Sequence, residues 1–257
     1  MTQAPNFTVV IPVYNEEGIL RSSIVDLVQR LDALERSYEI VLAENGSTDR
    51  TLAVAGELSR RFPQLSYFST GEPGHGNYGK ALRRAILDAR GEYVLCDEID
   101  LCDTAFHAGA LALLDSGEVD LVIGSKLADG ASDERPFMRH LGSLVINAML
   151  RVALDFKGTD THGLKAFRRS VVAPIAERCV VERDLFASEL VIRCEREGVS
   201  LREIPVRIKE MRAPSTHLFR RVPRVLTNLA KLTVAIRFSS GERTAQAAHE
   251  SPASTPE

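Results

Sequence analysis

The chain has 257 residues, a formal net charge of -3 at pH 7, 44% hydrophobic residues and 26% charged residues. These values are ordinary for a globular protein, and the slightly acidic balance argues against a nucleic-acid-binding protein. No apolar run is long enough to span a bilayer, and the four cysteines show neither a CxxC pair nor zinc-site spacing. Because the first residues do not resemble a signal peptide, we expect a reduced, cytoplasmic setting.

The first half of the chain alternates short β-rich runs with longer segments of helical spacing. Strands are predicted at 7–12, 39–43, 65–69, 92–96 and 120–125, and helices at 16–34, 48–62, 80–89 and 106–114. This alternation predicts an α/β fold with right-handed βαβ units and a mostly parallel central sheet covered by helices on both faces. Ligands of such folds bind beyond the carboxyl ends of the strands.

The second half is less regular and has longer polar loops. Helices are predicted at 141–154, 185–197 and 222–236, a strand at 201–208, an extended segment at 165–169, and polar loops at 129–136 and 157–163. The last helix has an apolar face and a basic face, so it either packs onto the domain or lies on an anionic membrane surface. The tail at 239–257 has the composition of a disordered segment.

An acidic cluster directly follows the strand predicted at 92–96. Four carboxylates lie within the seven residues from Asp97 to Asp103. Carboxylates that lie close together repel one another, and one or more would stay protonated unless a cation neutralised them. A divalent cation with a diphosphate as its own ligand is the natural neutraliser. The cluster therefore predicts an enzyme that acts on an activated phosphate compound.

Two further strand ends carry polar side chains. The first strand runs into Tyr14-Asn15-Glu16, and the second runs into Glu44-Asn45-Gly46-Ser47. Taken singly, each segment is equally well explained as a strand end followed by a turn and a helix N-cap. Because the carboxyl ends of parallel strands meet at one edge of a sheet, we expect both segments to lie near the acidic cluster.

Taken together, the three segments resemble family 2 glycosyltransferases of the GT-A fold. That family has a VIPVYNEE-like strand end (here Val10–Glu17), a VDDGSTD-like strand end (here Leu42–Asp49) and a DxD element (here Glu98-Ile99-Asp100). The segments at 160–169 and 184–190 are similar to those of the dolichol-phosphate mannosyltransferase group and its bacterial polyprenyl-phosphate relatives.

The resemblance covers roughly residues 7 to 238 and implies a domain organisation and an activity. It implies one GT-A domain over 1–238, with a nucleotide-sugar half at 7–125, an acceptor half at 126–212 and a basic amphipathic helix at 218–238. The implied reaction is an inverting, Mg²⁺- or Mn²⁺-dependent sugar transfer from a GDP- or UDP-linked donor to a polyprenyl phosphate. The implied membrane contact is peripheral, at the cytoplasmic face.

For the donor site, the resemblance implies roles for individual side chains. Glu98 and Asp100 would hold the metal ion, and Asp97 is a competing ligand in the other register. The side chains expected to face the donor are Pro12, Tyr14, Glu16, Glu44, Asn45, Lys80 and Asp97. Lys80 is equally well explained as a solvated lysine at a helix start. Glu44-Asn45 and Glu98 depart from the usual DD and DxD, which leaves the nucleobase undetermined.

For the acceptor site, the implied chemistry depends on the acceptor. A hydroxyl needs a general base, whereas a phosphate is already ionised near pH 7 and needs cationic groups to hold it. The cationic candidates are Lys165, Arg168, Arg169 and Arg212. Arg168 and Arg169 are adjacent on an extended segment and cannot share a side.

Two loop residues complete the candidate set, and three readings of the function stay open. Asp160 is expected to position the acceptor or the sugar, to act as the base for a hydroxyl acceptor, or to cap its loop. His162 is a metal ligand, a diphosphate contact or an incidental histidine. Besides the polyprenyl-phosphate transferase, the alternatives are transfer to a hydroxyl of a small molecule or cell-envelope glycan and a decayed nucleotide-sugar-binding module.

Overall fold

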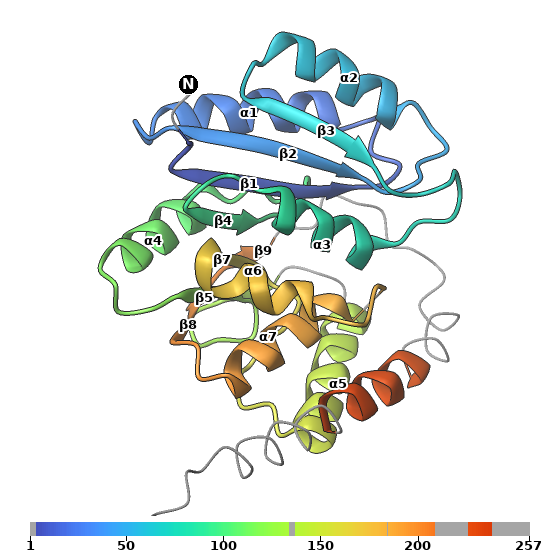
Figure 1. Cartoon of the computed structure of the whole chain (residues 1–257), viewed down its shortest axis with the longest axis vertical. Helices are drawn as coiled ribbons and strands as arrows, with labels where there is room; N and C mark the ends of the chain where they lie inside the picture. The colour runs from blue at the N-terminus through green and yellow to red at the C-terminus, as the bar shows by residue number, and fades with distance from the viewer. Residues whose placement is uncertain (1–3, 134–136, 184, 209–225, 238–257) are drawn as a thin grey trace, which may run out of the picture.

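A computed structural model of the chain describes residues 4–133, 137–183, 185–208 and 226–237. Its centre is a seven-stranded sheet in the order β3-β2-β1-β4-β7-β5-β8, with helices on both faces (Figure 1). The mostly parallel α/β sheet expected from the sequence is confirmed. Arg212, the first part of the helix expected at 218–238 and the tail at 239–257 lie outside the described residues.

Six of the seven strands in the sheet point in the same direction. The strands are β1 (Phe7–Val13), β2 (Tyr38–Glu44), β3 (Leu65–Ser69), β4 (Tyr93–Cys96), β5 (Leu121–Ser125), β7 (Leu164–Arg168) and β8 (Leu201–Pro205). The exception is β7, which is antiparallel to both of its neighbours, β4 and β5. Two short strands, β6 (Ser132–Asp133) and β9 (Arg207–Ile208), pair in parallel outside this sheet.

The helices follow the predicted order, with one addition. They are α1 (Leu20–Asp32), α2 (Thr51–Arg61), α3 (Tyr78–Asp88), α4 (Thr104–Asp115), α5 (Phe137–Leu154), α6 (Arg169–Glu177), α7 (Phe186–Arg196) and the helical residues 226–237. Helix α6 directly follows β7 and was not predicted. It contains Pro174, a residue that usually ends a helix because it cannot donate a backbone hydrogen bond.

The core has two layers, one on each face of the sheet. Strand β1 shows the alternation: Val9 and Ile11 pack with residues of α1, α2 and α4, whereas Val10 packs with residues of α3, α6 and α7. Leu150 of α5 and Leu232 of the last helix belong to this second layer. Because the middle strands are buried on both faces, polar side chains are placed where the strands end.

The carboxyl ends of β1, β2, β4 and β5 meet at one edge of the sheet, here called the carboxyl edge. Since β7 is antiparallel, the loop before it also reaches this edge. Gly163 makes that approach possible, because a Cβ added there would lie 1.8 Å from the carbonyl oxygen of Gly124 in β5. Only glycine lets the two backbones come so close.

Candidate active site at the carboxyl edge of the sheet

The loops that follow β1 and β2 are tied together by hydrogen bonds. The backbone N–H of Asn15 donates to Ser47 Oγ at 3.0 Å, and Asn15 Oδ1 accepts from the backbone N–H of Thr48 at 2.8 Å. Asn15 has a positive φ of 56°, which asparagine tolerates better than most residues. The backbone N–H of Glu16 donates to Thr51 Oγ1 at 2.7 Å. The first two sequence motifs therefore form one structural unit.

Glu44 and Asn45, at the end of β2, are buried and use their side-chain oxygens within the protein. The Glu44 carboxylate accepts from the backbone N–H of Ser47 and from Ser69 Oγ. Burial alone would raise the pKa of Glu44, but these hydrogen bonds hold it below its ordinary value. Asn45 Oδ1 accepts from the backbone N–H of Asn77. Both residues lie at the predicted edge, where they shape the loops around it.

The glycine-rich loop at 71–79 packs onto this unit. An added Cβ at Gly71 would lie 2.9 Å from the nitrogen of Gly46, and one at Gly76 would lie 3.2 Å from the Tyr14 ring. Tyr14 remains 40% exposed, so its ring is available to a ligand. Lys80 lies in the first turn of α3 with its side chain exposed, and Asn77 caps that helix. Pro12, near the end of β1, is half-buried.

The acidic loop after β4 has an inner and an outer part. Asp97 is buried: its Oδ2 lies 2.7 Å from His107 Nε2, and its Oδ1 accepts from the backbone N–H of Glu98 at 2.7 Å. Glu98 and Asp100 are half-buried, on either side of the buried Ile99. The structure therefore corrects the expectation that Asp97 is an alternative metal ligand, because its carboxylate faces inward to His107.

The donor set of the outer part suits a hard divalent cation. Among the described residues, no group of three or more His, Cys, Asp and Glu side chains is arranged to hold a metal ion. Mg²⁺ and similar ions are commonly held by one or two carboxylates, with water and substrate phosphates completing the shell. Glu98 and Asp100 fit this kind of site, in which a diphosphate supplies the remaining oxygens.

Across β7 from the acidic loop, Asp160 and Lys126 form a buried ion pair. Lys126 Nζ lies 3.0 Å from Asp160 Oδ2, and the two side chains are 6% and 1% exposed. Asp160 Oδ1 also accepts from the backbone N–H of His162 at 2.9 Å. Burial acts to raise the pKa of Asp160, but the charge of Lys126 and these hydrogen bonds hold it below its ordinary value.

Sequence reasoning missed Lys126. Its position directly after the apolar strand β5 is the same signal that identified Asp97, but a single lysine is usually a solvated surface residue.

Lys165 lies in β7 opposite Cys96, the last residue of β4. Its side chain is buried, its Nζ donates to the carbonyl oxygen of Gly163 at 2.7 Å, and burial lowers its pKa. His162 is half-buried, and its Nδ1 lies 3.1 Å from Thr161 Oγ1. The carboxyl edge thus brings together carboxylates after β4 and cationic groups from β5 and β7.

The structure does not bring Arg168 and Arg169 to this edge. Because β7 is antiparallel to β4, Arg168 pairs with Tyr93, the first residue of β4, at the opposite edge. Arg168 contacts Glu92 at 2.7 Å and Asp120 at 3.3 Å. The expectation that these two arginines hold the acceptor phosphate is therefore corrected. Strand direction, which the residue pattern does not show, separates them from Lys165.

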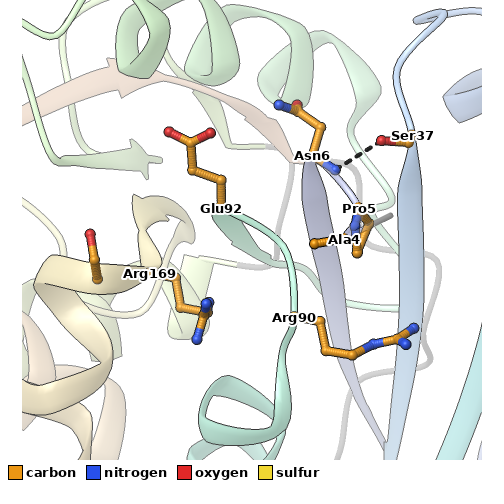
Figure 2. A pocket seen from close by; sticks show the side chains of 8 residues that line it. Ala4, Pro5, Asn6, Ser37, Arg90, Glu92 and Arg169 are labelled. Carbon is orange, nitrogen blue, oxygen red and sulfur yellow. Dashed lines mark hydrogen bonds between the residues drawn. The ribbon is translucent and has the colours of Figure 1, made fainter. Parts of the chain in front are cut away.

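Arg169 contributes instead to a pocket of about 620 Å³ at this opposite edge, together with Arg90 and Glu92 (Figure 2). The Arg169 Nε donates to the carbonyl oxygen of Gly91 at 2.9 Å. In Figure 2 the side chains of Arg90 and Glu92 point away from one another. The pocket therefore lacks a set of side chains that converge on one point, and it holds none of the carboxylates after β4.

Comparisons with known proteins agree with this geometry. The family model described as "Glycosyl transferase family 2" matches residues 8–175. Glycosyltransferase AglD of Haloferax volcanii is 28% identical over 203 residues, which are 77% of this chain and 32% of AglD. Dolichyl-phosphate beta-glucosyltransferase ALG5D of Trichomonas vaginalis is 27% identical over 217 residues, which are 79% of this chain and 65% of that protein. The chain thus spans less than two thirds of these relatives' lengths.

Solved structures of low sequence identity share the fold. Glucosyl-3-phosphoglycerate synthase from Mycobacterium tuberculosis, in complex with Mn²⁺, UDP and glucosyl-3-phosphoglycerate, superposes with a TM-score of 0.63 at 19% identity, covering 89% of this chain and 80% of that one. Mannosyltransferase PcManGT from Pyrobaculum calidifontis, in complex with GDP-Man and Mn²⁺, gives 0.58 at 21% identity, covering 92% and 65%. With the family model matching more than half of its length, this chain belongs to glycosyltransferase family 2 and has the GT-A fold.

Proposed function

We propose that this protein transfers a hexose from a nucleoside-diphosphate sugar to a polyprenyl phosphate. The observation that carries the proposal is the arrangement of charge at the carboxyl edge. Glu98 and Asp100 follow β4, and the Lys126–Asp160 pair lies on the far side of β7. Similarity to dolichyl-phosphate glucosyltransferases supports this choice of acceptor.

At the donor end, the carboxylates of Glu98 and Asp100 would hold Mg²⁺ or Mn²⁺ together with the donor diphosphate. When bound, such an ion acts as a Lewis acid that stabilises negative charge on the leaving nucleoside diphosphate. The exposed ring of Tyr14 and the loops shaped by Glu44 and Asn45 would enclose the nucleoside. The relatives' bound nucleotides include both UDP and GDP-mannose, so either base is compatible with the fold.

At the acceptor end, the state of Asp160 favours a phosphate over a hydroxyl. A carboxylate with a lowered pKa is a weak base, and Asp160 is already paired with Lys126. A phosphate acceptor needs no base but does need positive charge, which Lys126 and Lys165 supply. An oxygen of the acceptor phosphate would form the new bond to the anomeric carbon as the bond to the diphosphate breaks. Attack from the opposite side inverts that carbon.

The acceptor's lipid chain requires contact with a membrane, and α5 and the helix at 226–237 offer a suitable surface. Arg237 of the last helix donates to the carbonyl oxygen of Ala153 in α5 at 2.9 Å, and the two helices lie side by side (Figure 1). Among the side chains that the structure describes, the exposed large hydrophobic residues of these helices are Leu144, Val145, Val152, Leu226 and Val234.

Among the described residues, no helix is long and apolar enough to cross a bilayer. We propose that this two-helix surface rests on an anionic membrane, at its cytoplasmic face, with Lys231 and Arg237 near the head groups.

An acceptor screen with the purified protein tests the function. UDP-glucose and GDP-mannose are each incubated with a polyprenyl phosphate, a polyprenol, a simple alcohol and 3-phosphoglycerate, with Mn²⁺, with Mg²⁺ or with a chelator. Metal-dependent product with the polyprenyl phosphate alone is the expected result. Product with the alcohols alone would contradict the proposal and favour the hydroxyl-acceptor alternative. Binding of no nucleotide sugar in calorimetry would favour a decayed donor site.

A further inference from the structure

His107, a residue outside all the sequence motifs, lies directly behind the acidic loop. It is in the first half of α4 and is 1% exposed, and its Nε2 is 2.7 Å from Asp97 Oδ2. Both of its ring nitrogens and Asp97 Oδ2 are buried, and none of the three makes a hydrogen bond of standard geometry among the described residues. Nε2 is the ring nitrogen that lies beside the Asp97 carboxylate, so a neutral His107 ring would carry its proton on Nε2.

Three groups of Asp97, its backbone N–H and its two carboxylate oxygens, contact the surrounding protein, and one of these contacts fixes the neighbouring residue Glu98. The backbone N–H of Asp97 donates to the carbonyl oxygen of Val10 in β1 at 3.0 Å, and its two carboxylate oxygens contact His107 and the backbone N–H of Glu98. The carbonyl oxygen of Glu98 accepts from the backbone N–H groups of Leu101 and Cys102 at 2.9 and 3.1 Å. Both backbone polar groups of Glu98 are thus fixed.

The helix that carries His107 begins at the other end of the same loop. Asp103 caps α4 by accepting from the backbone N–H of Phe106 at 3.0 Å, and the backbone N–H of His107 donates to the carbonyl oxygen of Asp103 at 3.0 Å. The loop that holds Glu98 and Asp100 is therefore closed at both ends, by Asp103 at the helix start and by the Asp97–His107 contact.

We propose that His107 is a positioning residue for the metal site: through Asp97 it sets the direction in which Glu98 and Asp100 present their carboxylates. A buried polar pair costs desolvation, and an apolar pair of equal volume would serve the fold as well or better. The 2.7 Å contact between Asp97 and His107, directly behind Glu98 and Asp100, is therefore better explained by positioning of the loop than by stability. The inference rests on the proposed metal-dependent function.

Mn²⁺ binding in the presence of UDP, followed by calorimetry or by electron paramagnetic resonance, tests the inference without measuring turnover. His107→Met keeps most of the volume and removes the polar contact with Asp97, so the Kd for Mn²⁺ should rise about 10- to 100-fold. His107→Gln can place its amide nitrogen near the position of Nε2 and should restore most of the affinity. Leu111→Met, a buried substitution on the same helix, is the matched control and should leave the Kd unchanged.

Two further measurements keep the outcomes distinct. If His107→Met does not fold, the double variant Asp97→Leu/His107→Leu removes both polar partners, and it should fold and still bind Mn²⁺ weakly. A folded His107→Met or double variant with the Kd of the unchanged protein overturns the inference alone. Failure of the unchanged protein to bind Mn²⁺ with either UDP or GDP overturns the proposed metal-dependent function, and with it the inference.

Discussion

Lys126 Nζ and Asp160 Oδ2 lie 3.0 Å apart in a buried ion pair that joins the end of β5 to the loop before β7. The two residues are 34 positions apart in sequence, and the close packing of Gly163 on Gly124 brings their segments together. The pair supplies one buried positive charge next to a carboxylate that is ionised at neutral pH. We therefore expect its removal to lower stability and, in the proposed reaction, to weaken acceptor binding.

Lys126→Met should destabilise the protein by about 3 kcal/mol, because it leaves the Asp160 carboxylate buried without its partner. It should also raise the KM for the acceptor phosphate more than the KM for the donor. Urea unfolding and steady-state kinetics measure the two effects. Lys126→Arg keeps the charge and should retain part of the stability and part of the acceptor binding. Lys157→Ala, at an exposed lysine, should change neither the unfolding free energy nor the acceptor KM. A stable Lys126→Met with unchanged acceptor KM would contradict this role.

The stability cost of Lys126→Met should depend on pH. In the unchanged protein the pKa of Asp160 is held below its unfolded value of about 3.9, so its contribution to the unfolding free energy is present above that pH and lost as the pH falls further. Without Lys126, burial raises the folded pKa above 3.9, so the variant gains stability as the pH falls through that raised value.

The difference in unfolding free energy between the two proteins should therefore shrink as the pH falls from about 7 to about 4. Urea titrations at several pH values measure it. A difference that is independent of pH would show that Asp160 keeps the same pKa without Lys126.

Gly163→Ala should lower the unfolding free energy by about 1–3 kcal/mol, because its Cβ would overlap the carbonyl oxygen of Gly124. The loop would have to move, and acceptor turnover should fall with it. Gly109→Ala is a matched control, because Gly109 lies within α4 and nothing lies within 4 Å of an added Cβ. This change should raise the unfolding free energy by at most about 1 kcal/mol. Chemical denaturation of the two variants tests this contrast, and equal changes would refute it.

Asp100→Asn should lower metal-dependent transfer about 100-fold or more while leaving the thermal midpoint near that of the unchanged protein. Asn keeps the size of the side chain and removes the charge that a divalent cation needs. Product formation at several Mn²⁺ concentrations, with circular dichroism as the folding check, measures the effect. Glu118→Gln, at an exposed acid paired with Arg202, is the control. Full turnover by Asp100→Asn would mean that the metal site lies elsewhere.

Val152→Glu combined with Val234→Glu should weaken binding to anionic vesicles, because both side chains are exposed on the two-helix surface. Turnover of polyprenyl phosphate in vesicles should fall, whereas turnover of a short-chain soluble analogue should be kept. Vesicle sedimentation and the two assays distinguish these effects. An equal loss with both acceptors would point to damage in the fold instead of lost membrane contact.

Much of the sheet could be predicted because its strands are buried, β-branched runs between turn residues. The strand predicted at 65–69 matches β3, three others in the first half differ from the structure by one residue at one end, and the strand predicted at 39–43 is one residue short of β2 at each end. The direction of β7 could not be predicted, because a five-residue strand pairs either way and only tertiary packing decides. That is why Lys165 reaches the carboxyl edge and Arg168 does not.

Within the site, the sequence identified the acidic loop but did not show which of its carboxylates are buried and which face the carboxyl edge. Asp97 and Glu98 are adjacent and chemically alike, and what separates them is His107, ten residues beyond Asp97 in the chain. Lys126 was missed for a related reason, since its partner Asp160 comes from a distant loop. The family could be predicted because three strand-end motifs in fixed order are specific as a set, and the family model confirms it.

The antiparallel strand β7 also sets the distance between the ends of β4 and β5, which substitution of side chains does not change. It separates β4 from β5 by two inter-strand spacings, about 10 Å in total. The carboxylates after β4 and the Lys126–Asp160 pair after β5 are anchored on either side of this interval. Backbone hydrogen bonds between the strands keep this separation constant. A relative with the same sheet that uses another sugar or acceptor would therefore have to accommodate it by longer or shorter side chains at the carboxyl edge.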